Sequence, residues 1–176
     1  MPLFVHIAPE PKLKVILRNG IAPTHWTPDP AAHPEADRVV WVFPVLQSHT
    51  LTHSWARELK RWGRTTLAAI TVRLRDDEMV FARHYRDRPL AMTAGEAVGI
   101  IRAVEDPSGF EVMVPRRVRP GEIVRARVLD RTFGWRYAPH FKGKPLPSCD
   151  CPMCLPRGEV KAAVQREQIF ERIRAE

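Results

Sequence analysis

The chain lacks several features that would have placed it in familiar classes. No apolar run approaches the ~18–20 residues that a membrane-spanning helix needs, and the N-terminus lacks the charged-then-apolar pattern of a secretory signal. Cysteine is absent outside the segment from Cys149 to Cys154, which excludes a disulfide framework. We therefore expect a cytoplasmic protein with no membrane partner.

The length and net charge of the chain limit the number of domains and the kind of partner to expect. The 176 residues suffice for one domain with a hydrophobic core and a small appendage. A net charge of +8 favours an anionic partner, such as nucleic acid. A basic surface that keeps the protein soluble is the simpler explanation of the same charge.

Hydrophobic patterns predict a mixed α+β fold. Short strands interrupted by two or three helices, without regular βαβ alternation, indicate a split, mostly antiparallel sheet with short helices. We place this domain at residues 1–135, and a Pro/Cys-rich loop with a C-terminal helix at 136–176. The expected strands are 3–7, 39–43, 67–74, 79–84, 110–114 and 123–129. The expected helices are 11–19, one capped by Ser48, Thr50 or Thr52 that runs to about 62, 93–103 and 159–174.

Two ionisable side chains stand in apolar strands far apart in sequence. His6 lies in the strand 3–7, and Glu111 lies in the strand 110–114. A helix ending in Gly20-Ile21 follows the first strand, and a Pro-x-x-Ile turn at 120–123 follows the second. This order resembles the small ADP-ribosyltransferase-like fold, in which a His and a Glu hold the nicotinamide riboside of NAD.

The resemblance implies roles for these residues. His6 would bind the adenosine-side ribose, and Glu111 would bind the 2′-hydroxyl of the nicotinamide ribose and stabilise the ribosyl cation. Arg18, near the His strand, would bind the pyrophosphate. Taken alone, His6 also fits a core histidine bonded to backbone, Glu111 the solvent face of an edge strand, and Arg18 a solvated helix residue.

The family's middle motif is a Tyr, Ser or His from a central strand. The corresponding strand here, 39–43, contains no Tyr, and Ser48 and His49 follow it as the best candidates. Further on, Leu51, Trp55, Leu59 and Trp62 share one face of the expected helix, and we interpret that stripe as core.

The cysteine cluster predicts a structural zinc site. Cys149, Cys151 and Cys154 lie within six residues of a Pro-rich loop, and thiolates are preferred zinc ligands. The fourth ligand would be His140, Asp150 or a residue of another chain. Three reduced thiols without a metal are the alternative.

Two classes of function remain open. The resemblance implies NAD-dependent ADP-ribosyl transfer to a macromolecular acceptor, protein or nucleic acid. A non-enzymatic, zinc-stabilised nucleic-acid-binding protein is the alternative, and a catalytically inactive member of the same fold is a third. The basic residues that favour a nucleic-acid partner are Arg116, Arg117, Arg119, Arg125, Arg127, Arg131 and Arg136, with the aromatic residues Trp135, Tyr137 and Phe141 nearby.

Overall fold

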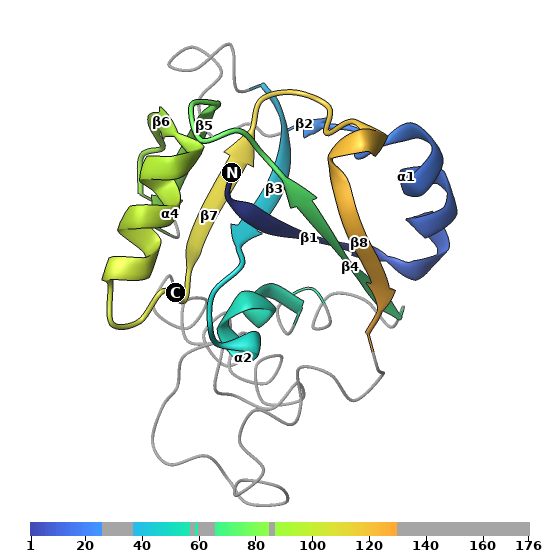
Figure 1. Cartoon of the computed structure of the whole chain (residues 1–176), viewed down its shortest axis with the longest axis horizontal. Helices are drawn as coiled ribbons and strands as arrows, with labels where there is room; N and C mark the ends of the chain where they lie inside the picture. Colours follow the sequence, from blue (N-terminus) through green and yellow to red (C-terminus); the bar gives the residue numbers. More distant parts are fainter. Residues whose placement is uncertain (26–36, 57–58, 60–65, 85–86, 130–176) are drawn as a thin grey trace, which may run out of the picture. The chain divides into compact units, whose positions relative to one another are not determined.

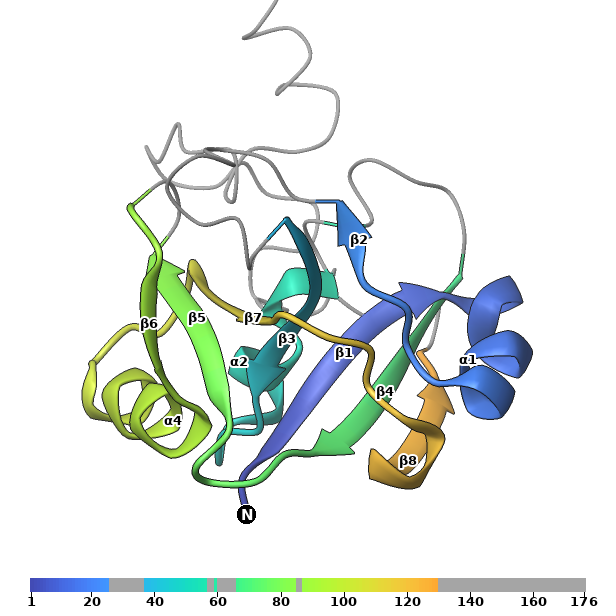
Figure 2. The same cartoon turned by 90° about the horizontal axis from the view of Figure 1, so that it is seen from above.

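A computed structural model describes residues 1–25, 37–56, 59, 66–84 and 87–129, and its described part is an α+β domain with a mostly antiparallel sheet (Figures 1 and 2). This confirms the expected class. The described elements are β1 (Leu3–Pro9), η1 (Glu10–Lys12), α1 (Leu13–Asn19), β2 (Thr24–His25), β3 (Arg38–Pro44), α2 (His49–Thr52), β4 (Leu67–Arg73), β5 (Met79–His84), β6 (Leu90–Thr93), α4 (Ala94–Ala103), β7 (Phe110–Val114), η3 (Pro120–Glu122) and β8 (Ile123–Val128).

The sheet consists of two halves joined at a short seam. The strand order is β6-β5-β7-β3-β1-β4-β8, and β2 pairs with β3 outside this path. β1 pairs with β4 along its whole length, from Leu3 to Pro9. By contrast, β1 pairs with β3 at two positions, Phe4 opposite Pro44 and Val5 opposite Phe43. Beyond Val5 the strands β1 and β3 therefore no longer form a backbone ladder.

The largest core cluster fills one side of the sheet. Its fully buried side chains include Phe4, Ile70 and Val112 from three different strands. α4 adds Ile101 and smaller apolar side chains to this cluster, and Figure 1 shows α4 beside β5, β6 and β7. Burial of this apolar surface is the main stabilising contribution to the domain.

α4 begins where the sequence predicts. Thr93 accepts a hydrogen bond from the Glu96 backbone N–H at 3.2 Å, and the Glu96 carboxylate accepts one from the Thr93 backbone N–H at 2.8 Å. This reciprocal capping box satisfies two backbone donors that the helix itself leaves unpaired.

Gly20 ends α1 and brings the chain against the turn after β7. Its φ is +77°, which favours glycine, and a Cβ there would lie 2.1 Å from the Val118 carbonyl oxygen. The next residue, Ile21, exchanges both backbone hydrogen bonds with Val118, at 2.8 and 3.1 Å. The glycine is thus required both by its dihedral angle and by close packing.

Several local predictions need correction. β1 extends to Pro9, and β2 and β6 were not predicted as strands. The helix expected through Trp62 is interrupted, because α2 ends at Thr52 and His53 forms a turn before helical structure resumes. The segment 136–176, with its expected C-terminal helix, lies outside the described residues. Within the described part of the chain, no helix is long and apolar enough to cross a membrane.

Candidate active site

A pocket of about 310 Å³ opens where β1 and β3 separate. This volume is at the lower end of the range, about 300–1,000 Å³, that small-molecule sites occupy. The lining is mostly apolar and aromatic, with two ionisable side chains, His6 and Glu111. The lining residues are Val5, His6 and Ile7 from β1, Trp41, Val42 and Phe43 from β3, Trp55 and Leu59 from the segment after α2, and Glu111 from β7.

His6 bridges the gap between the two separating strands. Its Nδ1 lies 2.8 Å from the Trp41 carbonyl oxygen. Because a carbonyl only accepts, Nδ1 carries the proton and the neutral ring keeps Nε2 as an acceptor. Burial lowers the pKa of His6, although the bond to Trp41 opposes this. The ring is therefore neutral at pH 7, oriented by one hydrogen bond, and able to accept a hydrogen bond from a hydroxyl group through Nε2.

Glu111 is held by an ion pair within the sheet. Arg83 lies directly opposite it in the β5–β7 ladder, and Arg83 Nε donates to Glu111 Oε2 at 2.5 Å. Both side chains are largely buried, with exposed fractions of 14% and 16%. Burial raises the pKa of Glu111, whereas Arg83 lowers it through its hydrogen bond and charge.

Aromatic side chains surround these two groups. The Arg83 guanidinium lies over the Trp41 ring, 5.6 Å from its centre, which is a cation–π contact. Trp55 donates its indole N–H to the Phe110 carbonyl oxygen at 2.9 Å, which fixes this ring beside the strand that carries Glu111. Trp55 and Leu59, interpreted from the sequence as core, line the pocket, and Leu59 is 42% exposed.

The other predicted NAD-binding residues do not line this pocket. Arg18 is exposed in the last turn of α1. Ser48 caps the short helix α2, since its hydroxyl accepts from the Leu51 N–H at 3.3 Å. His49 is exposed, and its Nε2 accepts a hydrogen bond from Arg127. The structure thus brings His6 and Glu111 together in one pocket lining, of which Arg18, Ser48 and His49 are not part.

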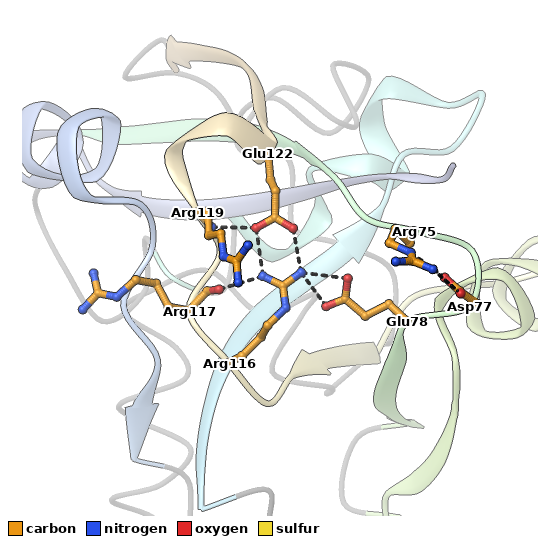
Figure 3. Close-up of polar contacts among 7 residues, drawn as sticks. All are labelled: Arg75, Asp77, Glu78, Arg116, Arg117, Arg119 and Glu122. Atoms are coloured by element: carbon orange, nitrogen blue, oxygen red, sulfur yellow. Dashed lines mark hydrogen bonds and ion pairs between the residues drawn. The ribbon is translucent and has the colours of Figure 1, made fainter.

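Part of the basic run is used in internal ion pairs, as Figure 3 shows. Arg116 donates to both carboxylate oxygens of Glu122, at 2.6 and 2.8 Å, and to Glu78 at 2.7 Å. These bonds raise the pKa of Arg116. The network ties the turn after β7 to the start of β5, and the Arg116 guanidinium in it is already paired with two carboxylates.

The remaining predicted contacts fall outside the described residues. These are the zinc ligands Cys149, Cys151, Cys154 and His140, and the basic and aromatic residues from Arg131 onward. In the residues that the structure does describe, no group of His, Cys, Asp and Glu is arranged to hold a metal ion.

The sequence alone gave no signal for Arg83 as the partner of Glu111, because they lie 28 residues apart and meet only through strand pairing. Trp41 was visible in a predicted strand, but its contact with His6 depends on the seam. Comparison with known proteins adds no assignment, since no family model and no curated protein matches this chain.

Proposed function

We propose that this protein has an ADP-ribosyltransferase-like fold and transfers the ADP-ribosyl group of NAD to a macromolecular acceptor, protein or nucleic acid. One observation carries the proposal: His6 and Glu111, 105 positions apart in the sequence, line the same pocket at the split of the sheet. If either residue were simply structural, nothing would require the two to share a cavity.

In the proposed reaction, the bond between C1′ of the ribose and the nicotinamide nitrogen breaks. Its electron pair leaves with nicotinamide, and the ribose becomes an oxocarbenium-like cation. A lone pair of the acceptor then forms the new bond to C1′, and the acceptor's proton passes to the carboxylate or to water. The chain must therefore orient the ribose, exclude water and place negative charge beside C1′.

Glu111 suits the electrostatic part of this task. Its carboxylate lies in a mostly apolar pocket, where a charge acts more strongly than it does in water. Arg83 fixes one carboxylate oxygen and favours the ionised form of the group. The net shift of the Glu111 pKa is upward because burial has the larger effect, and the ion pair with Arg83 limits that rise.

The remaining lining suits the nicotinamide half of the ligand. Trp41, Phe43 and Trp55 offer flat apolar surfaces to an aromatic ring. His6 Nε2 can accept a hydrogen bond from a ribose hydroxyl. A pocket of about 310 Å³ is small for a whole dinucleotide, so the rest of NAD would extend along the surface.

The alternative, a non-enzymatic nucleic-acid-binding protein, has less support from the described residues. It needs a continuous basic groove, whereas Arg116 is enclosed by two carboxylates and Arg117 donates to the Asn19 carbonyl oxygen at 3.0 Å. It also leaves the shared pocket of His6 and Glu111 without a purpose. A basic surface near the site would still serve a nucleic-acid acceptor.

The deciding experiment incubates the full chain with NAD labelled in the adenylate portion, alone and with protein, DNA and RNA acceptors. We expect free nicotinamide and label on one acceptor class, and loss of both with Glu111→Gln. Glu105→Gln is the matched control, since Glu105 is exposed and does not line the pocket. If no acceptor is labelled and no nicotinamide is released above a blank, the proposed function is wrong.

A further inference from the structure

Three basic side chains form a cluster beyond the pocket. Arg127 of β8 donates through Nη2 to Nε2 of His49, and the same Nη2 lies 3.3 Å from Nε2 of His53. The two imidazole rings lie 4.3 Å apart, centre to centre. His53 Nδ1 donates to the His49 carbonyl oxygen at 2.9 Å, which fixes its ring orientation. The cluster therefore joins the end of the sheet to the segment around α2.

Arg127 carries the positive charge of this cluster. Within the described part of the chain, no carboxylate pairs with Arg127. Its partners are two imidazoles that act as acceptors, and burial, with the nearby guanidinium, keeps the pKa of both histidines low. A half-buried guanidinium held by neutral groups retains its full positive charge, and an anion would find a fixed cation there.

The pairing of the strands places this cluster close to the pocket. Ala69 of β4 lies opposite Arg127 on one side and opposite Ile7 on the other. Directly paired residues point to the same face of a sheet, so these three side chains form one row. Two strand spacings separate Arg127 from Ile7, or about 10 Å. Since Ile7 lines the pocket, the cation lies within reach of a ligand that extends from it.

The segment that carries His53 packs on this same face. Ala56 is fully buried and joins Ala69 and Val5 in one apolar cluster. His53 itself is 5% exposed. The imidazole that supports Arg127 is thus fixed by core packing, which makes the position of the cation well defined.

We propose that Arg127, His49 and His53 form a phosphate-binding subsite for a ligand whose sugar and base occupy the pocket. Two sources of phosphate fit this chemistry, the pyrophosphate of a dinucleotide and the backbone phosphate of a nucleic-acid acceptor. The assignment deepens the function proposed above and rests on it for the identity of the ligand. Phosphate binding itself is testable without any turnover.

The first test uses inorganic pyrophosphate and the unaltered full chain. Titration followed by NMR should shift the imidazole signals of His49 and His53 and leave that of the exposed His25 in place. In calorimetry at low salt, Arg127→Ala should weaken pyrophosphate binding by about 10-fold or more, as expected for loss of a charge-assisted contact. Arg125→Ala is the matched control, because Arg125 lies on the same strand and face, opposite Thr71, and is exposed.

The second test separates the two phosphate sources. If the subsite takes the dinucleotide, Arg127→Ala weakens binding of ADP-ribose and leaves that of a short single-stranded oligonucleotide nearly unchanged. If the subsite instead binds the phosphate of the acceptor, Arg127→Ala weakens binding of the oligonucleotide and leaves that of ADP-ribose nearly unchanged. Nicotinamide riboside, which has no phosphate, should bind the parent protein and the Arg127→Ala variant with equal affinity.

Two results would overturn the subsite: histidine signals that do not respond to pyrophosphate, or equal losses of affinity for Arg125→Ala and Arg127→Ala. The latter would indicate diffuse attraction to a basic surface. Pyrophosphate binding without NAD turnover would leave the subsite in place and remove the proposed reaction. NAD turnover without pyrophosphate binding would support the proposed reaction and rule out the subsite.

Discussion

The imidazole of His6 donates to the carbonyl oxygen of Trp41 at 2.8 Å, just past the point where β1 and β3 cease to pair. This side-chain bond spans the gap that the backbone ladder leaves. The same residue therefore has a structural contact and a place in the pocket lining, and its two ring nitrogens divide these tasks. Nδ1 serves the fold, and Nε2 remains as the acceptor for a ligand.

The roles proposed for His6 and Glu111 predict different kinetic effects when each residue is replaced. Glu111→Gln keeps the shape of the side chain and removes its charge, so we expect kcat to fall about 10²–10³-fold. His6→Ala should mainly raise KM, because His6 holds the ribose and does not face the breaking bond. Steady-state kinetics of nicotinamide release would measure both. Equal losses of kcat in the two variants would contradict the assigned roles.

Replacing Arg83 tests whether it keeps Glu111 ionised. Because Arg83 lowers the pKa of Glu111 and burial raises it, Arg83→Met should raise this pKa further. The acid limb of the pH–activity profile should then move to higher pH, and NMR titration of the Glu111 carboxyl should show the same direction. Arg75→Met is the control: Arg75 pairs with Asp77 (Figure 3), both side chains are exposed, and neither residue lines the pocket. An unchanged titration of Glu111 would show that Arg83 has no such effect.

The buried histidine His53 predicts a pH dependence of stability. Burial lowers the pKa of His53 from 6.5 to about 4; the hydrogen bond to the His49 carbonyl oxygen opposes this, whereas the charges of His49 and Arg127 add to it. Between these values the unfolded chain binds a proton that the folded chain does not, so stability falls as pH falls from about 6.5 to 4. This His53 contribution is present in full above pH 6.5 and amounts to roughly 3 kcal/mol.

Urea unfolding at a series of pH values would measure this dependence. His53→Gln should flatten the slope of unfolding free energy against pH in that window. His25→Gln should not, because His25 is exposed. Parallel slopes for His53→Gln and the parent chain would rule out His53 as the titrating group.

Two glycines should respond in opposite directions to alanine. Gly20→Ala introduces a Cβ at positive φ and against the Val118 carbonyl oxygen, so we expect a loss of about 2 kcal/mol or more. Gly99 is exposed inside α4, with nothing within 4 Å of its Cβ position. Gly99→Ala should therefore stabilise the chain by about 0.5–1 kcal/mol. Thermal or urea unfolding of both variants checks the pair.

The cysteine cluster predicts a single structural zinc ion. Protein purified without chelator should contain zinc by elemental analysis, and Cys151→Ser should lower that content. A chain that carries no more than trace metal would contradict the prediction. The measurement requires no activity and so does not depend on the proposed function.

Local chemistry accounts for what the sequence by itself determined. Short apolar runs located β1, β3, β4, β5, β7 and β8 to within a few residues, and Thr93 with Glu96 located the start of α4. These features depend on near neighbours, as strand alternation and helix capping do. His6 and Glu111 could be singled out because an ionisable side chain in an apolar strand is visible in the sequence.

Tertiary structure alone decided the composition of the site. His6 meets Trp41 across 35 positions, Arg83 meets Glu111 across 28, and Arg127 meets His49 across 78. Such contacts depend on strand order, on register and on where a ladder stops, and hydrophobic periodicity specifies none of these. A one-residue change of register would reverse the face of every side chain in a strand. The pocket, the ion pair within it and the cationic cluster beside it therefore follow from how the strands pair.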